Sequence, residues 1–430
     1  MNTSKLTETF TLESGETINN LQLGYHTYGE LNQDKNNVVW VFHALTANSD
    51  VMSWWPGLFG EADLFNPEEH FIICVTAIGS PYGSTTPNDL YFPQFTVRDV
   101  VKAQLLLAKE LEIEKIHVAI GGSFGGSQAL EFAYSYEGKI DNLILVASAA
   151  LESAWGIAIH ESQRLALQAD PTFGEPAGGK AGLKAARAMG MVTYRSSEYF
   201  IEHQTEADDR TGEFRAASYI QHQGEKLKQR FDALSYYYLI NCLDTHNIGR
   251  NRGGLVRALS KITCRTLVIG IESDQLIRTK QQVFLADNLP NASYREIESK
   301  FGHDGFLVET GKITSLIDDF LEERNVLGIS TEELSILIKR SENFQLIDVR
   351  EPFELELSSI GGINIPLAEI PTHMDKISSN KKVIVYCRSG RRSATAIQQI
   401  LKAKGHSDIY NLEGGILDWA DKIDNTMELY

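Results

Sequence analysis

Cysteine is scarce in this chain of 430 residues. The four cysteines, Cys74, Cys242, Cys264 and Cys387, are far apart, and no two of them form a C-x-x-C pair. This spacing argues against a disulfide-rich secreted scaffold and contains no metal-ligand pattern. Free thiols are typical of a reducing compartment, so the sequence predicts a cytoplasmic protein without a bound metal.

Long apolar runs are missing as well. No stretch approaches the roughly 18 consecutive apolar residues that a membrane helix needs. The amino terminus, MNTSKLTETFTLESGET, has no basic start followed by an apolar segment, so no signal peptide is expected. We therefore expect no association with a membrane.

Positive charge is in deficit. Lysine and arginine number 40 against 57 aspartates and glutamates, which gives a formal net charge of −17. A surface that acidic repels phosphate backbones, so nucleic acid is not an expected partner. An anionic co-substrate would need a local basic patch.

Short apolar runs rich in valine and isoleucine alternate with helical patterns in the first part of the chain. Runs without polar alternation are typical of strands that are buried on both faces of a parallel sheet. Residues 97–111 and 126–136 are expected to be helices. The fold class is therefore α/β, with a mostly parallel sheet covered by helices. The predicted strands begin at Val38, Phe71, Ile116, Asn142, Thr266 and about Ser293.

Two domains are expected, because a single core rarely grows to this length. Residues 151–262 interrupt the strand rhythm with a polar, helix-compatible stretch, which predicts a helical cap over a substrate pocket. The first domain is assigned to residues 1–325, and the second, with an α/β rhythm of its own, to residues 330–430. Between them, Gly328 is expected to stop a helix. Ser330 stands three residues before a glutamate, the spacing of a capping box that begins the next helix.

A strand, a tight turn and a helix surround Ser123. The strand IHVAI runs into Gly121-Gly122-Ser123-Phe124-Gly125, a G-x-S-x-G sequence, and a helical pattern follows. Glycine neighbours let the backbone make the sharp turn that exposes a serine hydroxyl at the carboxyl edge of a sheet. A glycine-rich turn without chemistry is the alternative, which the flanking strand and helix disfavour. The pattern predicts a nucleophilic serine in an α/β-hydrolase sheet.

A serine nucleophile needs a base, and the base needs an acid that orients it. In α/β-hydrolases the acid precedes the histidine along the chain. Asp274 follows the predicted strand TLVIGIES, with Glu272 as the competing carboxylate. His303 lies in FGHDGF, after the last strand and before the last helix of this domain. Asp274 and His303 are therefore the expected partners of Ser123.

Two backbone N–H groups are needed to hold the oxyanion of an acyl-transfer reaction. The residue after the nucleophile, Phe124, is expected to supply one of them. The other should come from the loop after the early strand VVWVF, where the sequence reads HALT, and Leu45 is the predicted donor. The alternative is that HALT merely ends a strand.

Several segments of the first domain, in the same order, resemble the homoserine O-acetyltransferase family. The resemblance implies that Ser123 takes an acyl group from acetyl-CoA or succinyl-CoA, and that the homoserine hydroxyl then attacks the acyl-enzyme with His303 as base. It implies a step of methionine biosynthesis, small-molecule substrates and no bound cofactor. The segments that carry it are HALT, GGSFGGSQALEF, GMVTYRS, RFDALSYYY, HNIGRNRGG, ESDQL and GHDGF.

In that family, an arginine of the cap and an acid beside the catalytic histidine hold the amino-acid end of the substrate. Arg195 in TYRS and Asp304 in GHD are the matching positions. A guanidinium can clamp a carboxylate with two hydrogen bonds, and a carboxylate can pair with an ammonium group. An ordinary surface salt bridge is the alternative for Arg195.

Phe124, Ala47 and Ser127 depart from the family's usual methionine and glycine near the acyl site. Acetyl versus succinyl as the acyl group, and homoserine versus serine as the acceptor, therefore stay open. A plain serine hydrolase and a sulfur-relay scaffold with a decayed hydrolase fold are further alternatives. Arg195 speaks against the first, and the intact catalytic set against the second. Many such acyltransferases form homodimers through the cap, which this sequence leaves open.

The second domain carries a candidate site of its own at Cys387. KKVIVYC ends a predicted strand there, RSGRRS follows, and a helix is expected from about Ala394. A cysteine at the start of such a loop faces backbone N–H groups and the amino end of a helix, which favours the thiolate. The loop residues expected to hold a persulfide or an anion are Arg388, Ser389, Gly390, Arg391 and Arg392.

IDVREPFE, GGINIPL, YCRSGRRS and NLEGGILDW make residues 344–419 resemble a single-domain rhodanese, although a usual histidine turn is missing. The resemblance implies sulfur transfer through a persulfide on Cys387 and a sulfur-relay partner. A cysteine phosphatase is the competing interpretation, but its C-x5-R loop would need arginine at Ser393. A non-catalytic binding module that keeps the fold is another.

Overall fold

The chain forms two compact units, residues 1–318 and 319–430. The division falls inside helix α12 (Thr310–Glu322), whereas the sequence predicted a boundary between residues 325 and 330. The computed structural model describes residues 1–6, 8–209, 211–322, 326–404 and 408–427.

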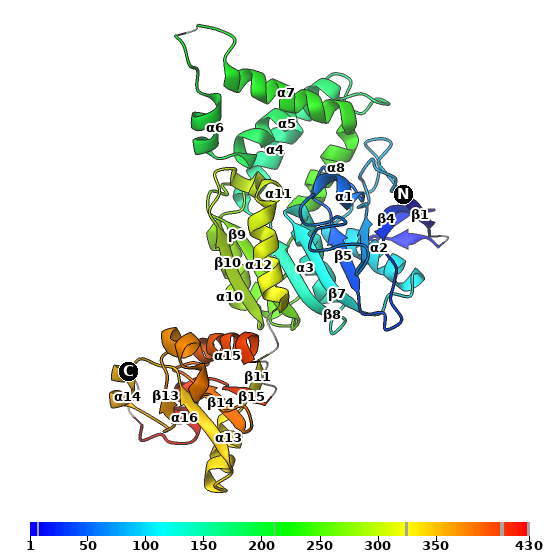
Figure 1. Cartoon of the computed structure of the whole chain (residues 1–430). Coiled ribbons are helices and arrows are strands. Elements are labelled where there is room, and N and C mark those ends of the chain that lie inside the picture. The colour runs from blue at the N-terminus through cyan, green and yellow to red at the C-terminus, as the bar shows by residue number, and fades with distance from the viewer. Residues whose placement is uncertain (7, 210, 323–325, 405–407, 428–430) are drawn as a thin grey trace. The chain divides into compact units, whose positions relative to one another are not determined.

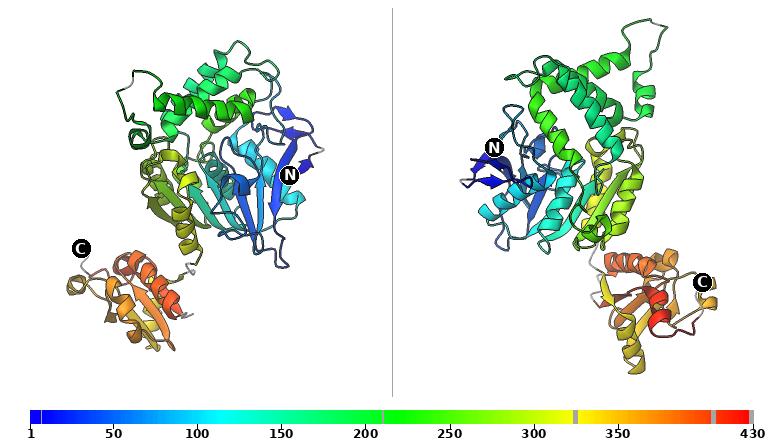
Figure 2. Two further views of the ribbon diagram at one scale, coloured as in Figure 1. Left: turned by 45° about the horizontal axis from the view of Figure 1, so that its top comes forward. Right: turned by 180° about the vertical axis from the view of Figure 1, so that it is seen from behind.

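The first unit is built on one sheet of eight described strands with helices on both faces (Figures 1 and 2). The second strand of the order pairs antiparallel with both the first and the third, and all later neighbours are parallel. The strand order is β1 (Asn2–Lys5), β4 (Gln22–Tyr28), β6 (Phe71–Val75), β5 (Val38–Phe42), β7 (Ile116–Gly122), β8 (Ile140–Val146), β9 (Arg265–Ile271) and β10 (Ala292–Ile297). A small hairpin of β2 (Phe10–Thr11) and β3 (Thr17–Ile18) lies outside this sheet.

The strands predicted from the apolar runs are confirmed as β5 to β10. Every residue of β5, VVWVF, is buried, as expected for a central strand covered on both faces. The helix predicted at residues 97–111 is α2 (Val97–Glu110). The helix after the serine, α3 (Phe124–Ser135), begins two residues earlier than predicted, because Gly125 and Gly126 lie within its first turn.

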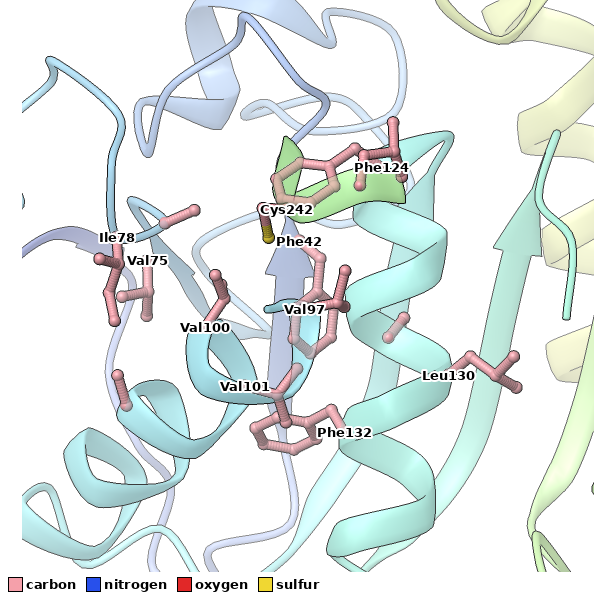
Figure 3. Packing of buried hydrophobic residues seen from close by; sticks show 14 of the residues in the cluster. Phe42, Val75, Ile78, Val97, Val100, Val101, Phe124, Leu130, Phe132 and Cys242 are labelled. Carbon is pink, nitrogen blue, oxygen red and sulfur yellow. The ribbon is translucent and has the colours of Figure 1, made fainter. Parts of the chain in front are cut away.

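The main core of this unit packs α2 and α3 against β5 (Figure 3). The ring of Phe132 on α3 lies with its centroid 5.2 Å from the rings of both Trp40 and Phe42 on β5. Each fully buried large apolar side chain contributes about 1.5–3 kcal/mol relative to exposure. The contacts of Phe132 therefore hold α3 against the sheet, directly behind Ser123.

Between β8 and β9 the chain leaves the sheet and forms the cap. Its two ends meet in a short antiparallel neck, where Glu152 N–H donates to His246 O at 2.8 Å and Ile248 N–H donates to Ala150 O at 3.0 Å. Figures 1 and 2 show α4 to α7 gathered at one end of the sheet. The cap helices are α4 (Ala154–Gln168), α5 (Lys180–Tyr194), α6 (Ser197–Gln204), α7 (Arg215–Arg230) and α8 (Ala233–Asp244), and α9 (Leu255–Leu259) follows the neck.

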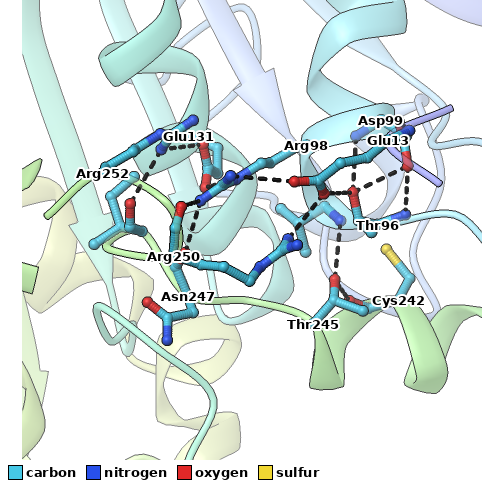
Figure 4. A network of polar contacts seen from close by, with 12 residues as sticks. Glu13, Thr96, Arg98, Asp99, Glu131, Cys242, Thr245, Asn247, Arg250 and Arg252 are labelled. Carbon is cyan, nitrogen blue, oxygen red and sulfur yellow. Dashed lines mark hydrogen bonds and ion pairs between the residues drawn. The ribbon is translucent and has the colours of Figure 1, made fainter. Parts of the chain in front are cut away.

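An ion network joins the start of the chain to α2, α3 and the segment after the cap (Figure 4). Glu131 of α3, with 2% of its side chain exposed, pairs with Arg98 Nε at 3.1 Å and with Arg252 Nη1 at 2.7 Å. Arg98 also reaches Glu13 at 3.2 Å, and Glu13 pairs with Arg250 at 2.9 Å. Segments far apart in sequence are thereby tied to the helix that begins at the serine.

The remaining described elements of the first unit flank the sheet or lead into its last helix. The helix α10 packs on β9 and β10. These remaining elements are α1 (Val51–Trp54), α10 (Thr279–Asn288), the short 3₁₀ helix η1 (Gly302–Asp304) and α11 (Gly305–Val308).

The second unit is a parallel sheet of five described strands covered by helices on both faces. Alternate residues of its central strand point to opposite faces. Val383 and Val385 belong to the core beside α15 (Arg391–Lys404), and Ile384 and Tyr386 to the core beside α16 (Gly415–Lys422). The strand order is β11 (Leu327–Ile329), β15 (Ile409–Leu412), β14 (Lys382–Tyr386), β12 (Phe344–Asp348) and β13 (Ile363–Asn364), and the other helices are α13 (Thr331–Lys339), α14 (Pro352–Leu357), η2 (Leu367–Thr372) and η3 (Met374–Lys376).

The prediction that Gly328 stops a helix is wrong. Gly328 lies in β11, which pairs with β15, and a β-carbon there would collide with the side chain of Glu413. The glycine thus leaves room for the side chain of Glu413, a residue far away in the sequence, which a local pattern could not reveal. The capping box predicted at Ser330 and Glu333 is confirmed at the start of α13.

Replacing Glu131 with glutamine is expected to lower the free energy of unfolding by about 3 kcal/mol, because Arg98 and Arg252 lose the charge that compensates them in a buried place. Glu112→Gln is the matched control, since Glu112 pairs with Lys35 at the surface, and a change below about 1 kcal/mol is expected there. Urea unfolding followed by tryptophan fluorescence measures both. Equal effects in the two variants would contradict the prediction.

Candidate active sites

Ser123 occupies a strained turn between β7 and α3. Its φ of 56° and ψ of −123° lie where residues other than glycine are rarely found, at a cost on the order of 1–3 kcal/mol. A β-carbon at Gly121 would collide with the Gly125 carbonyl, and one at Gly125 with the Phe42 carbonyl. The glycines of the motif are therefore required for the close packing that holds this turn.

The structure brings Ser123, His303 and Asp274 into one hydrogen-bonded line. The Ser123 hydroxyl lies 2.7 Å from His303 Nε2, and His303 Nδ1 lies 2.7 Å from Asp274 Oδ2. His303 and Asp274 are almost completely buried. Because a carboxylate only accepts, Nδ1 carries the proton and Nε2 is left to accept the proton of the serine hydroxyl. This arrangement can activate a serine oxygen as a nucleophile.

Asp274, rather than the competing Glu272, contacts the histidine. Its other oxygen, Oδ1, accepts the backbone N–H groups of Leu276 and Ile277, both at 2.9 Å. The turn after β9 thus orients the carboxylate, and the carboxylate in turn orients the imidazole of His303.

The charges around His303 determine its pKa. Burial lowers the pKa of His303, but Asp274 raises it, with help from Asp304 and Glu152, and the balance lies above the ordinary value. Sequence reasoning did not single out Glu152, whose own pKa is raised by burial and whose Oε1 accepts the Ser153 N–H at 2.8 Å. Its place between β8 and the first cap helix, α4, is the signal that could have indicated it.

Of the two predicted oxyanion donors, Phe124 follows Ser123 directly and Leu45 lies in the loop after β5. Phe124 begins α3, and its fully buried ring belongs to the main core. Leu45 lies in a turn closed by a hydrogen bond from Ala47 N–H to Ala44 O at 3.0 Å. Within the described part of the chain, neither the N–H of Leu45 nor that of Phe124 has a hydrogen-bond acceptor, so both are available to a ligand oxygen.

Arg195 and Asp304 meet next to His303. Arg195 Nε lies 3.3 Å from Asp304 Oδ2, and each side chain is about one-sixth exposed. The guanidinium also lies 5.0 Å from the ring centre of Tyr199 and 5.5 Å from that of Phe301. Aromatic neighbours of this kind stabilise the cation and hold it in place.

Cys387 lies at the end of β14 and at the start of a loop that leads into α15. Its side chain is almost completely buried, and Ser393 Oγ lies 3.4 Å from its sulfur. Gly390, with a φ of 87°, makes the bend of the loop, and a backbone N–H of the following segment, that of Ile416, donates to Cys387 O at 2.9 Å. The sulfur therefore belongs to the apolar core beside α15, with one hydroxyl in contact.

The arginines of this loop are not all available to hold an anion in the way that the sequence predicted. Arg392 forms two short hydrogen bonds with Glu354 of α14, at 2.5 and 2.7 Å, so a nearly buried carboxylate balances its charge. Arg388 and Ser389 are exposed. The side chain of Arg391 lies outside what the structure describes. Arg392 thus contributes less positive potential to the loop than the sequence predicted.

In the residues that the structure describes, no group of three or more histidine, cysteine or acidic side chains is arranged to hold a metal ion. None of the described helices combines the length and apolar character needed to cross a membrane.

Comparison with known proteins gives matches to both units. Residues 37–310 match the family described as alpha/beta hydrolase fold, and residues 330–422 match the rhodanese-like domain. The homoserine O-acetyltransferase of Cyclobacterium marinum is 42% identical over 330 residues, covering 74% of this chain and 94% of that protein. The homoserine O-acetyltransferase of Nostoc punctiforme is 38% identical over 333 residues, covering 73% and 94%.

Solved structures give the same result. The homoserine O-acetyltransferase of Staphylococcus aureus is 32% identical with a TM-score of 0.64, covering 74% of this chain and 94% of that one. Esterase E22, at 22% identity and a TM-score of 0.68, covers 74% and 99% and shows likeness of fold alone. The predicted fold class, an α/β-hydrolase sheet with a helical cap followed by a rhodanese-like domain, is confirmed. The chain is an acyltransferase that belongs to the homoserine O-acetyltransferase family and carries a rhodanese-like domain behind its acyltransferase part.

Proposed function

We propose that this protein transfers the acetyl group of acetyl-CoA to the hydroxyl of L-homoserine, a step of methionine biosynthesis, through an acyl-serine on Ser123. The observation that carries the proposal is the hydrogen-bonded line from Ser123 through His303 to Asp274, with the Arg195–Asp304 pair beside it. The relatives named homoserine O-acetyltransferase supply the choice of reaction.

In the first half-reaction, Ser123 Oγ attacks the thioester carbonyl and His303 Nε2 takes its proton. The oxyanion is held by the N–H groups of Phe124 and Leu45, which have no other acceptor among the described residues. The thiolate of CoA then leaves and takes the proton from His303. The products are acyl-Ser123, free CoA and a neutral histidine.

In the second half-reaction, the homoserine hydroxyl gives its proton to His303 and attacks the carbonyl carbon of the acyl-serine. The bond between that carbon and Ser123 Oγ then breaks, Oγ takes the proton from His303, and the acylated homoserine is released. Arg195 binds the α-carboxylate and Asp304 the α-ammonium group. Nη1 of Arg195 is buried without a hydrogen-bond acceptor among the described residues, which leaves a donor for a carboxylate next to the Nε that faces Asp304. Opposite charges held side by side match the zwitterionic end of an amino acid.

Acetyl is proposed over succinyl on electrostatic grounds as well as on the relatives' names. Asp274, Asp304 and Glu152 all act on His303. A succinyl group would bring another carboxylate into this field, where like charges repel. Serine in place of homoserine is one methylene shorter, so its hydroxyl would lie farther from His303 when its charged end is held by Arg195.

For the second unit, we propose sulfur transfer through a persulfide on Cys387. The adjoining helix start and the Ser393 hydroxyl, 3.4 Å from the sulfur, favour a monoanionic sulfur species. The pairing of Arg392 with Glu354 disfavours a phosphatase, which needs a free guanidinium for a dianion. The four free cysteines support a reducing compartment, and we propose the cytoplasm.

Mixing the protein with acetyl-CoA and homoserine is expected to release CoA rapidly, and omission of homoserine should slow the release strongly. Ser123→Ala should abolish it, because no acyl-serine can form, whereas Ser14→Ala in the exposed β2–β3 hairpin should behave as wild type. Thiol titration of free CoA measures the rate. Release at the same rate without any amino acid would indicate a hydrolase, and preference for succinyl-CoA or serine would correct the substrates alone.

Asp274→Asn is expected to lower the rate of Ser123 acylation by about 10⁴-fold, because the imidazole loses its orienting acceptor. In the wild type, acylation should rise with pH through the His303 pKa, which Asp274 holds above its ordinary value. The acidic limb of the variant should therefore shift to lower pH. Acylation by p-nitrophenyl acetate across pH measures both, with exposed Asp141→Asn as control. An unshifted limb would contradict the electrostatic role of Asp274.

Thiosulfate is expected to transfer its outer sulfur to Cys387 and release sulfite, and cyanide should then remove the sulfur as thiocyanate. Cys387→Ser should abolish thiocyanate formation. Cys264→Ser is the matched control, because burial raises the pKa of Cys264 to about 11 and leaves it unreactive. Thiocyanate colorimetry, with mass spectrometry of the persulfide, measures the outcome. If the wild-type protein forms no thiocyanate, a non-catalytic binding module is favoured.

A further inference from the structure

We propose that two buried side chains, Gln128 and His43, are positioning residues that hold the two halves of the oxyanion hole in register. The inference rests on the proposed acyl chemistry of Ser123, but not on the identity of the acceptor. It concerns two backbone N–H groups, those of Leu45 and Phe124, which come from loops far apart in sequence. A residue that contacts both segments must therefore set the relative placement of these two N–H groups.

The direction of the first donor, the N–H of Leu45, is set through the Ala44 carbonyl. In a trans peptide the N–H of Leu45 points opposite to the C=O of Ala44, so the groups that hold Ala44 O also aim Leu45 N–H. Ala44 O lies 3.0 Å from Ala47 N–H and 2.8 Å from His43 Nδ1.

The tautomer of His43 follows from its other neighbour. His43 Nε2 accepts the N–H of Ala77 at 2.9 Å, so the ring proton is on Nδ1, where it donates to Ala44 O. Burial lowers the pKa of His43 to about 4, so the ring stays neutral near neutral pH. Because the neutral ring has only one donor, Nδ1, the hydrogen bond to Ala44 O is fixed, and with it the conformation of the turn.

The direction of the second donor, the N–H of Phe124, is set in the same way. The N–H of Phe124 shares its peptide with the carbonyl of Ser123. That carbonyl accepts from Gly126 N–H at 2.9 Å and from Ser127 N–H at 3.2 Å, both in the first turn of α3. The start of the helix thereby sets the direction of this donor.

The side chain of Gln128 links the two segments that carry these donors by hydrogen bonds. Its Nε2 donates to His43 O at 3.1 Å and to Phe124 O at 3.3 Å, one carbonyl from each loop. Its Oε1 accepts from Gln104 Nε2 at 2.9 Å, and Gln104 Oε1 accepts from Trp40 Nε1 at 3.2 Å. This chain fixes which end of the amide is the donor. As residue i+4 from Phe124 on a helix, Gln128 is placed to reach back over that carbonyl.

Packing alone does not call for these polar groups. Gln128 is completely buried, and apolar side chains of similar shape fill such a space without the cost of desolvating an amide. Stabilisation of an oxyanion, by contrast, depends on donors that are already in place before charge develops. An amide that bridges the two loops serves that requirement.

The test uses Gln128→Met in the full-length chain, which keeps the shape and removes the donors. Loss of one direct oxyanion donor costs roughly 100- to 1,000-fold, so loss of a positioning group should slow acylation by p-nitrophenyl acetate by roughly 10-fold or more, with KM within about 2-fold. The inhibition constant of methylboronic acid should rise by the same factor, because its tetrahedral adduct on Ser123 places an oxygen in the hole. Asn142→Leu is the control, a buried amide near the start of β8, at the opposite end of that strand from the site.

Equal losses in Gln128→Met and Asn142→Leu, or slower acylation without weaker boronate binding, would overturn the inference. Gln104→Met leaves Gln128 in place but frees its amide, and a smaller loss of the same two quantities is expected. Should Gln128→Met not fold, Gln104→Met decides in the same way, and wild-type values would overturn the proposal. A wild-type protein that does not acylate at Ser123 would instead contradict the proposed function.

Discussion

The left-handed backbone turn at Ser123 is the constraint around which the first unit is arranged. β7 leads into it, glycines around it admit neighbouring carbonyls, and the ring of Phe132 anchors the helix that follows to β5. Glu131, one residue before Phe132, joins the same helix to the segment that returns from the cap. A local strain on the order of 1–3 kcal/mol is thus supported by contacts from distant parts of the chain.

The charges around His303 suit the proposed chemistry on both sides of the reaction. Three carboxyl groups, from Asp274, Asp304 and Glu152, favour the protonated imidazole that forms when a hydroxyl gives up its proton. Arg195, beside Asp304, supplies the opposite charge for the acid end of an acceptor. The same arrangement of charges is therefore complementary to the zwitterionic acceptor that we propose.

The second unit builds its site from the same sequence of elements, a parallel strand that ends at a nucleophile and a helix that begins just beyond it. The two sites differ in their surroundings. Cys387 lies in an apolar core with the Ser393 hydroxyl in contact, and Arg392 is held by Glu354. The predicted basic loop is therefore less basic around the sulfur than its sequence indicates.

The amino-acid sequence by itself determined the strand rhythm, the G-x-S-x-G turn and the order of acid before histidine, because each follows from local rules of burial, backbone freedom and connection. It could not decide that Arg392 is paired with Glu354, or that Gln128 joins the loop after β5 to the start of α3. Those outcomes belong to the tertiary structure, since each depends on side chains separated along the chain that meet only when the sheet and its helices have packed.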